Sequence, residues 1–304
     1  SRVVDEPISR RIDGRAWTPG NYDGRYMGDI TLRRSIELSR NIPAIKLAEE
    51  VGPRTLQAFY RDVGLTKATN LPSASLGAFN VTPTELAGAY TVFPGGGEPS
   101  LPRVVESITD ADGKLIIAYP PESEPVASAR GAAMSTAVLQ GVIQNGTGRA
   151  AAKYGVTGPV GGKTGTTDQT RDAWFVGFTP STSVAVWVGH DRGANLGLTG
   201  SKAALPIWSH FVVASGIQGG RFEIPDGMHR RALCTESGLV ARGACPHSYD
   251  EVLSDGQGPK RKCDQHGGPV VEARSWLGGL FGKKKADVEG QGALGQDASG
   301  VTEP

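Results

Sequence analysis

The sequence lacks an excess of charge of either sign: 32 Lys and Arg stand against 31 Asp and Glu, for a formal net charge of +1. Nucleic-acid-binding domains usually carry a basic excess, so we expect no nucleic-acid partner. The sequence also lacks a signal segment and any apolar run long enough to cross a bilayer. It opens on Ser1, and its first methionine is Met27. We therefore expect a piece of a longer protein, in which case the missing targeting segment says nothing about location.

Cysteine is scarce, and the three cysteines, Cys234, Cys245 and Cys263, all fall late in the chain. An odd number allows one disulfide with a leftover thiol, or a metal site completed by His247 and His266. Structural zinc sites usually have tighter paired spacings than these. We therefore expect a loop staple or simple packing here, with no metal and no cofactor, although the metal alternative stays open.

Two common catalytic motifs are missing. Gly162-Lys163-Thr164 looks like the end of a phosphate-binding loop, but Thr157 stands where that loop needs glycine. No serine has the Gly-x-Ser-x-Gly setting of a hydrolase elbow. His190-Asp191 follows a predicted strand and is more typical of a turn than of a catalytic triad.

The hydrophobic pattern predicts helices early and an antiparallel meander late, which is typical of an α+β fold. Asp29 and Thr31 are available to cap the helix at 31–39. Thr82-Pro83-Thr84-Glu85 is a capping box, and Asp112-Gly113 predicts a hairpin turn. The expected helices are 31–39, 43–52, 54–63, one from 83, 129–143 and one within 200–215. The expected strands are 104–109, 114–119, 159–166, 173–178 and 183–189.

Composition divides the chain into three parts. Residues 1–215 hold the periodic segments and form the main domain. Residues 216–268 mix Gly, Pro, Cys and His with short apolar pieces, which predicts an irregular appendage. Residues 269–304 are mostly small and polar, and we expect disorder there.

The most informative segment is Lys163-Thr164-Gly165-Thr166-Thr167, on a predicted strand. The hydroxyls can donate to an anion, and Lys163 supplies a compact positive charge. Gly165 lets another backbone approach closely, because it has no Cβ. The segment therefore predicts a site for a carboxylate and an extended peptide.

Ser39-Arg40-Asn41 lies 124 positions before Lys163, between two predicted helices. A serine and an amide projecting into a cleft opposite a lysine-threonine-glycine strand are typical of acyl transfer by the Ser/Lys route. The alternative is that Ser39 or Asn41 simply caps the helix that Pro43 starts.

These motifs together resemble the C-terminal transpeptidase module of class A penicillin-binding proteins. The resemblance covers about the first 215 residues, in the order of the family. It implies a serine β-lactamase/D,D-peptidase-like fold with an antiparallel sheet and a helical cluster. Its further strings are Tyr22-Asp23-Gly24, Thr31-Leu32-Arg33, Leu76-Gly77-Ala78, 82–90, Gly146-Thr147-Gly148, Asp172-Ala173-Trp174-Phe175, Trp187-Val188-Gly189 and 204–208.

The resemblance also implies roles. Ser39 would relay a proton between the leaving amine and Lys163, and Asn41 would hold the substrate amide. Thr164, Gly165, Thr166 and Thr167 would bind the substrate, which is the D-alanyl-D-alanine end of a peptidoglycan stem peptide. β-Lactam antibiotics would occupy the same groove. The parent protein would be membrane-anchored and extracytoplasmic, with a glycosyltransferase domain upstream.

One departure matters. The family's nucleophile lies in a Ser-x-x-Lys motif, and no serine in these 304 residues has lysine three positions later. We expect that motif to lie upstream of Ser1, which would leave this fragment inactive alone. Two alternatives stay open: a D,D-carboxypeptidase or β-lactamase-like hydrolase, and a non-catalytic peptidoglycan-binding module.

Overall fold

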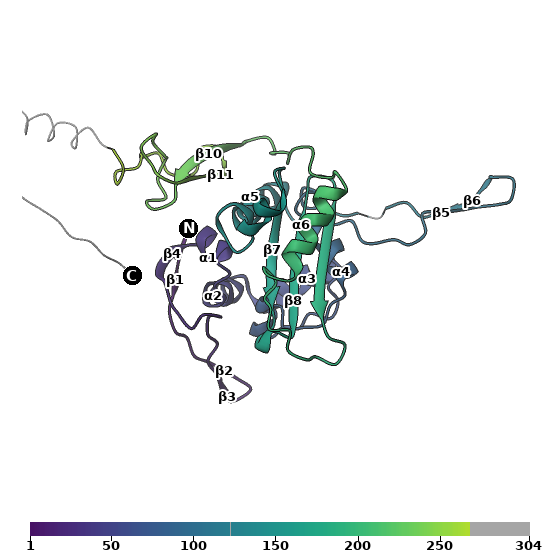
Figure 1. Ribbon diagram of the computed structural model, residues 1–304, viewed down its shortest axis with the longest axis horizontal. Coiled ribbons are helices and arrows are strands. Elements are labelled where there is room, and N and C mark those ends of the chain that lie inside the picture. Colours follow the sequence, from purple (N-terminus) through teal and green to yellow (C-terminus); the bar gives the residue numbers. More distant parts are fainter. Residues whose placement is uncertain (122, 268–304) are drawn as a thin grey trace, which may run out of the picture.

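Figure 1 shows the computed structural model, which describes residues 1–121 and 123–267. Several helices precede an antiparallel meander, so the predicted α+β class is confirmed. The tail predicted to be disordered, 269–304, lies outside the described residues. The elements in chain order are β1 (Arg2–Asp5), β2 (Arg10–Ile12), β3 (Arg15–Trp17), β4 (Gly28–Thr31), α1 (Leu32–Glu37), α2 (Asn41–Val51), α3 (Pro53–Asp62), η1 (Pro72–Leu76), α4 (Pro83–Tyr90), β5 (Ser107–Thr109), β6 (Leu115–Ala118), α5 (Ala129–Asn145), η2 (Arg149–Tyr154), β7 (Gly161–Thr166), η3 (Asp168–Thr170), β8 (Asp172–Phe178), β9 (Ser183–Gly189), α6 (Ala204–Ala214), β10 (Met228–Cys234) and β11 (Ser248–Ser254).

The central sheet has the order β7-β8-β9, and both pairings are antiparallel, as the sequence predicts. Side chains alternate between the two faces of a strand, so Phe175 and Phe178, three residues apart on β8, face opposite sides. Phe175 packs with Trp208 of α6, whereas Phe178 packs with Leu139 and Val142 of α5. Helices therefore cover both faces of the sheet (Figure 1).

Helix α6 is fixed on the sheet by its apolar stripe. Leu205, Trp208 and Val212 are fully buried, at the spacing that places them on one helix face. The Trp208 ring fits because Gly177 of β8 has no side chain: a Cβ there would lie 2.6 Å from Trp208 Cζ2. The same Trp208 ring packs on Phe175, with ring centroids 4.9 Å apart. This packing fixes the strands that carry the predicted site.

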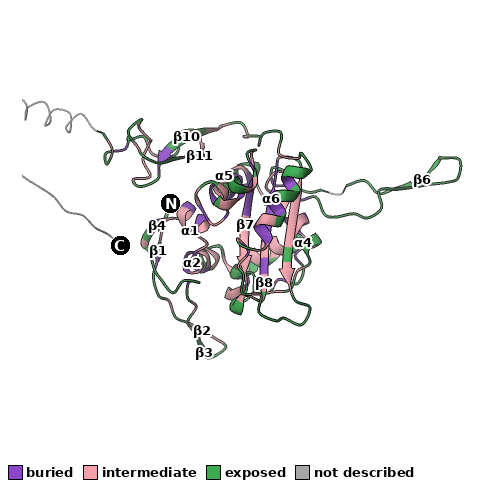
Figure 2. Cartoon of the chain, viewed as in Figure 1, coloured by how far each residue is buried: buried purple, intermediate pink, exposed green. Residues whose placement is uncertain are grey.

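The predicted capping signals are confirmed. The Oγ1 atom of Thr31 accepts the N–H of Arg34 at 3.1 Å and begins α1. Both bonds of the capping box are present at α4, where Thr82 Oγ1 accepts the Glu85 N–H and Glu85 accepts the Thr82 N–H. The hairpin β5–β6 also forms, and it extends from the body with exposed side chains (Figure 2).

The segment after α6 is more ordered than predicted. Strands β10 and β11 pair antiparallel over seven residues each, so the expectation of an irregular appendage is wrong for this hairpin. Charged residues interrupt both strands, which hides their alternation in the sequence. The hairpin lies against α1 and α5, where Arg33 Nη2 meets Glu251 Oε1 at 2.7 Å. The Arg33 guanidinium also lies over the Tyr249 ring, 4.6 Å from its centroid.

Candidate active site

Lys163 and Ser39 meet in the structure as the sequence predicts. The Lys163 Nζ, on β7, donates to the Ser39 Oγ at 2.6 Å. Ser39 lies in the turn between α1 and α2, 124 residues earlier. The same Nζ also donates to the carbonyl oxygen of Thr164 at 3.0 Å. The helix junction and the strand therefore share one polar centre.

Burial of the Lys163 ammonium lowers its pKa to about 8. The ammonium has lost water, and the hydrogen-bond partners given above are neutral oxygens, which compensate the charge only in part. A sizeable fraction of Lys163 is therefore neutral just above neutral pH. A lysine in that range can both accept and return a proton.

Ser39 has an unusual backbone conformation, with φ +56°. Its N–H bonds to the Ile36 carbonyl at 3.1 Å, and the Arg40 N–H bonds to the Ser35 carbonyl at 2.8 Å. This pattern of hydrogen bonds terminates α1. At such a helix end, the residue with positive φ, here Ser39, is usually glycine. A serine here costs about 1–2 kcal/mol of backbone strain, and it directs the hydroxyl at Lys163.

Helix α2 is capped by Asn21, from a different segment. The Asn21 Oδ1 accepts the N–H groups of Asn41 at 2.8 Å and of Ile42 at 3.4 Å. The Asn41 side chain instead donates to the Gly20 carbonyl at 2.8 Å. The alternative in which Ser39 or Asn41 caps this helix is therefore wrong, because Asn21 fills that role.

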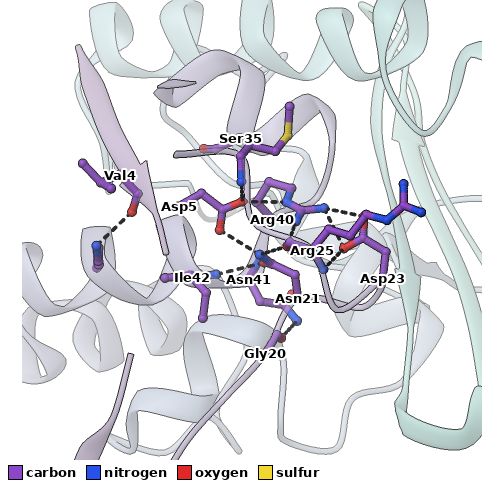
Figure 3. A network of polar contacts seen from close by, with 12 residues as sticks. Val4, Asp5, Gly20, Asn21, Asp23, Arg25, Ser35, Arg40, Asn41 and Ile42 are labelled. Carbon is purple, nitrogen blue, oxygen red and sulfur yellow. Dashed lines mark hydrogen bonds and ion pairs between the residues drawn. The ribbon is translucent and has the colours of Figure 1, made fainter. Parts of the chain in front are cut away.

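A buried polar network holds the turn (Figure 3). The fully buried Asp5 carboxylate accepts Asn21 Nδ2 at 2.7 Å, Arg40 Nε at 2.9 Å and the Met27 N–H at 3.1 Å. Arg40 also bonds both carboxylate oxygens of Asp23 at 3.0 Å and lowers its pKa. These bonds hold in place the turn that carries Ser39 and Asn41.

The sequence alone does not identify Asn21, Asp5 and Arg40 as positioning residues. The available signals were Tyr22-Asp23-Gly24, whose Asp23 bonds to Arg40, and Ser39-Arg40-Asn41, which contains Arg40. The ion pair itself spans 35 residues, and no local pattern shows it.

A cavity of about 630 Å³ opens beside this centre. Two of its hydroxyls, Thr147 Oγ1 and Thr164 Oγ1, lie 2.8 Å apart. A third, Thr166 Oγ1, accepts the Gly200 N–H at 3.1 Å. The lining includes Ser39, Asn41, Thr147, Thr164, Thr166 and Thr199. The cavity therefore combines an amide, a cluster of hydroxyls and the nearby Lys163.

Two predicted binding residues serve internal contacts. The Thr167 hydroxyl lies outside this lining, where it donates to Asp172 Oδ2 and accepts the Asp172 N–H, both at 2.9 Å. A Cβ added at Gly165 would lie 3.0 Å from Trp174 Cβ, and one added at Gly200 would lie 2.4 Å from the Gly165 oxygen. A side chain at Gly165 would therefore be tight against Trp174, and the absence of one at Gly200 lets that loop approach the Gly165 backbone closely.

Strand β7 lies at an edge of its sheet. Among the residues that the structure describes, it pairs only with β8. Its other edge can accept an extended peptide as an additional strand.

The family model described as "Penicillin binding protein transpeptidase domain" matches residues 5–211. The chain belongs to this family. Penicillin-binding protein 1A of Neisseria meningitidis is 36% identical over 241 residues, which is 74% of this chain and 30% of the relative. Penicillin-binding protein 1A of Aquifex aeolicus is 37% identical over 216 residues, 70% of this chain and 30% of the relative. The chain thus spans about a third of these relatives.

Solved structures agree with the family assignment. Penicillin-binding protein 1A from Haemophilus influenzae superimposes with a TM-score of 0.73 at 26% identity, covering 86% of this chain and 46% of that one. PonA1 from Mycobacterium tuberculosis, in complex with penicillin V, gives a TM-score of 0.61 at 21% identity, covering 74% and 66%. The second match supports the fold alone. The predicted class A transpeptidase module and its fold are confirmed.

None of the helices within residues 1–121 and 123–267 combines the length and the apolar character needed to cross a membrane.

Proposed function

We propose that this chain supplies the substrate-binding and proton-transfer part of a serine-type D,D-transpeptidase site. The parent would be a bifunctional peptidoglycan synthase, anchored at the membrane and acting outside the cytoplasm. Its substrate would be the D-alanyl-D-alanine end of a stem peptide, and β-lactams would acylate the same site. The observation that carries the proposal is the 2.6 Å contact between Lys163 Nζ and Ser39 Oγ beside the hydroxyl-lined cavity.

The nucleophile is assigned to a Ser-x-x-Lys segment outside the printed sequence. Its serine attacks the penultimate carbonyl and loses its proton to its lysine partner. Ser39 passes a proton, exchangeable with Lys163, to the departing D-alanine nitrogen. An amine from a neighbouring stem peptide then attacks the acyl-enzyme, which restores the serine and forms the cross-link.

The geometry of the cavity supports the following binding roles. The hydroxyls of Thr164 and Thr166 face the cavity and would bind the terminal carboxylate, with Lys163 supplying positive potential. Asn41 would hold the substrate amide, and the Thr166 N–H would be one oxyanion donor, a group typically worth ~10²–10³ in rate. Gly165 would let the peptide pair with β7. Thr167 keeps a supporting role, because its hydroxyl is engaged by Asp172.

A fluorescent penicillin tests the proposal on denaturing gels. The 304-residue chain alone should remain unlabelled, whereas the full-length parent protein should be labelled. Lys163→Met in the full-length protein should reduce labelling at least ~10²-fold, and the exposed Lys153→Met is the matched control. A labelled band from the printed chain would refute the assignment of the nucleophile.

Product analysis of the full-length protein separates the remaining functions. Cross-linked dimers support a transpeptidase, and free D-alanine without dimers would indicate a hydrolase. Reversible binding of stem peptide without any acyl-enzyme would indicate a non-catalytic binding module.

A further inference from the structure

Three cysteines and one histidine converge in the hairpin region that follows α6. One ligand atom from each of Cys234, Cys245, Cys263 and His266 lies within 4.8 Å of all the others. The Nδ1 of His266 lies 3.4 Å from Cys234 Sγ and 3.3 Å from Cys263 Sγ. His247, which the sequence offered as an equal candidate, is not part of this group.

The spacing of these atoms fits a tetrahedral metal. Zinc binds sulfur at about 2.3 Å and nitrogen at about 2.0 Å, so a tetrahedral site separates the two kinds of ligand by roughly 3.5 Å. The two S···N distances, 3.3 and 3.4 Å, are within a few tenths of an ångström of that value. Three thiol groups and one imidazole form a ligand set typical of structural zinc.

Backbone contacts bring these ligands together. Cys234 ends β10, and its N–H bonds to the Leu239 carbonyl at 2.8 Å. The Cys263 N–H bonds to the Val240 carbonyl at 2.8 Å, and the Cys245 N–H closes a turn with Arg242 at 3.0 Å. The site is therefore assembled by the fold and not by one local motif.

The expectation of no metal rested on loose spacings. Two short pairs, Cys245-Pro246-His247 and Cys263-Asp264-Gln265-His266, looked equally ligand-like in the sequence. In the structure the ligand atoms of Cys263 and His266 lie 3.3 Å apart, whereas only Cys245 of the other pair joins the cluster.

A second layer of contacts supports the four candidate ligands. Glu236 Oε2 lies 3.1 Å from His266 Nε2, so it can hold the ring with Nδ1 free for a metal. Ser237 Oγ donates to Cys263 Sγ at 3.3 Å, and the Arg242 N–H donates to Cys245 Sγ at 3.3 Å. Carboxylates on metal-bound histidine and donors to metal-bound sulfur are common in such sites.

The hairpin region has little apolar core of its own. Within 228–267 the buried residues are Leu233, Cys234, Val252 and Cys263, and two of these four are cysteines. All three cysteines are free thiols, so no disulfide staples the region. Units of about 40 residues usually depend on disulfides, metals or a partner surface for stability.

We propose that this region binds one divalent zinc-type cation through Cys234, Cys245, Cys263 and His266. With four protein ligands the coordination shell is closed, so the role is structural and not catalytic. The metal would lock β10 to the loops that follow it and hold the hairpin in the shape that docks on α1 and α5.

The test uses the whole chain, purified under reducing conditions. Elemental analysis should find one zinc per chain, and cobalt added to metal-free protein should give the intense visible bands of a tetrahedral thiolate site. Cys263→Ser should weaken zinc binding more than ~100-fold in competition with a chromogenic chelator, and His247→Ala should leave it unchanged. Glu236→Gln, which alters only the second layer, should weaken binding by ~10-fold.

The proposal would be overturned if the folded, reduced wild-type chain bound no stoichiometric zinc or cobalt. It would also be overturned if His247→Ala and Cys263→Ser lost zinc affinity equally. If Cys263→Ser does not fold, the stoichiometry and the cobalt spectrum of the wild-type chain still decide. A stable disulfide between two of the three cysteines in the metal-free native chain, unaffected by added zinc, would also count against it.

Discussion

The Asn21 Oδ1 accepts the backbone N–H of Asn41 at 2.8 Å, so a side chain 20 residues upstream caps the helix that presents the candidate amide. The same Asn21 donates to the buried Asp5 carboxylate at 2.7 Å. The position of Asn41 therefore depends on the segment before α1 as much as on α2 itself.

Asn21→Ala should lower the free energy of unfolding by about 2 kcal/mol, because it removes a helix cap and leaves Asp5 with one donor fewer. Urea unfolding measures the change. The exposed Asn70→Ala is the matched control and should stay within ~0.5 kcal/mol of wild type. An Asn21→Ala chain as stable as the control would show that the network contributes little.

Ser39→Gly and Ser39→Ala should differ in stability although both remove the hydroxyl. Glycine relieves the strain of φ +56°, whereas alanine retains it, so Ser39→Gly should be the more stable by about 1 kcal/mol. Thermal melts of the two variants make the comparison. Equal melting temperatures would contradict the strained conformation of this turn.

Lys163 should make stability rise with pH in the alkaline range. Its folded pKa is about 8, and its ordinary value is 10.5, so between these limits the unfolded chain binds more protons than the folded chain. The free energy of unfolding therefore increases with pH through that window. Below about pH 8 Lys163 is protonated in both states, so the cost of burying its ammonium is constant. Relative to Lys163→Met, the gain from pH 7 to 10.5 should be about 3 kcal/mol.

The measurement for Lys163 is the urea midpoint of wild type and variant from pH 7 to 10.5, compared at each pH. Taking the difference cancels the groups that titrate in both chains. The exposed Lys153→Met should follow the wild-type curve. Parallel curves for wild type and Lys163→Met would mean that the ammonium is solvated.

Gly200→Ala should disturb the part of the cavity that Thr166 and Thr199 line. A Cβ there would lie 2.2 Å from the Trp174 oxygen and 2.4 Å from the Gly165 oxygen, so the loop must move off β7. We expect a loss of about 1–3 kcal/mol in urea unfolding. Gly219→Ala, where the new Cβ has no neighbour within 4 Å, should cost under ~1 kcal/mol. If the two variants unfold alike, the loop does not pack on the strand as described.

Local signals in the sequence predicted the elements that carry the site. The capping box at Thr82, the cap at Thr31 and the apolar runs that form β8 and β9 depend on neighbours a few residues apart, and the structure confirms them. The short pairs β1–β4 and β2–β3 were missed. Two-stranded pairs of three or four residues are too short for periodicity to distinguish.

The candidate site also has parts that the sequence predicted and parts that it did not. The prediction that Lys163 and Ser39 lie at one centre is confirmed by their 2.6 Å contact. Thr167 was expected to bind the substrate; its hydroxyl lies outside the cavity lining and is engaged by Asp172, a contact that the sequence does not show. Asp5 and Asn21 were missed, since each acts through bonds to residues 16 to 35 positions away.

The sequence by itself determined which residues can do chemistry and where most helices and the strands of the central sheet lie, because those properties depend on residue type and short-range spacing. Tertiary structure decided which groups meet: Lys163 with Ser39, Asn21 with Asn41, and Cys234 and Cys245 with the Cys263–His266 pair. Such contacts depend on how separate segments pack, and packing is a property of the whole chain that no local window contains.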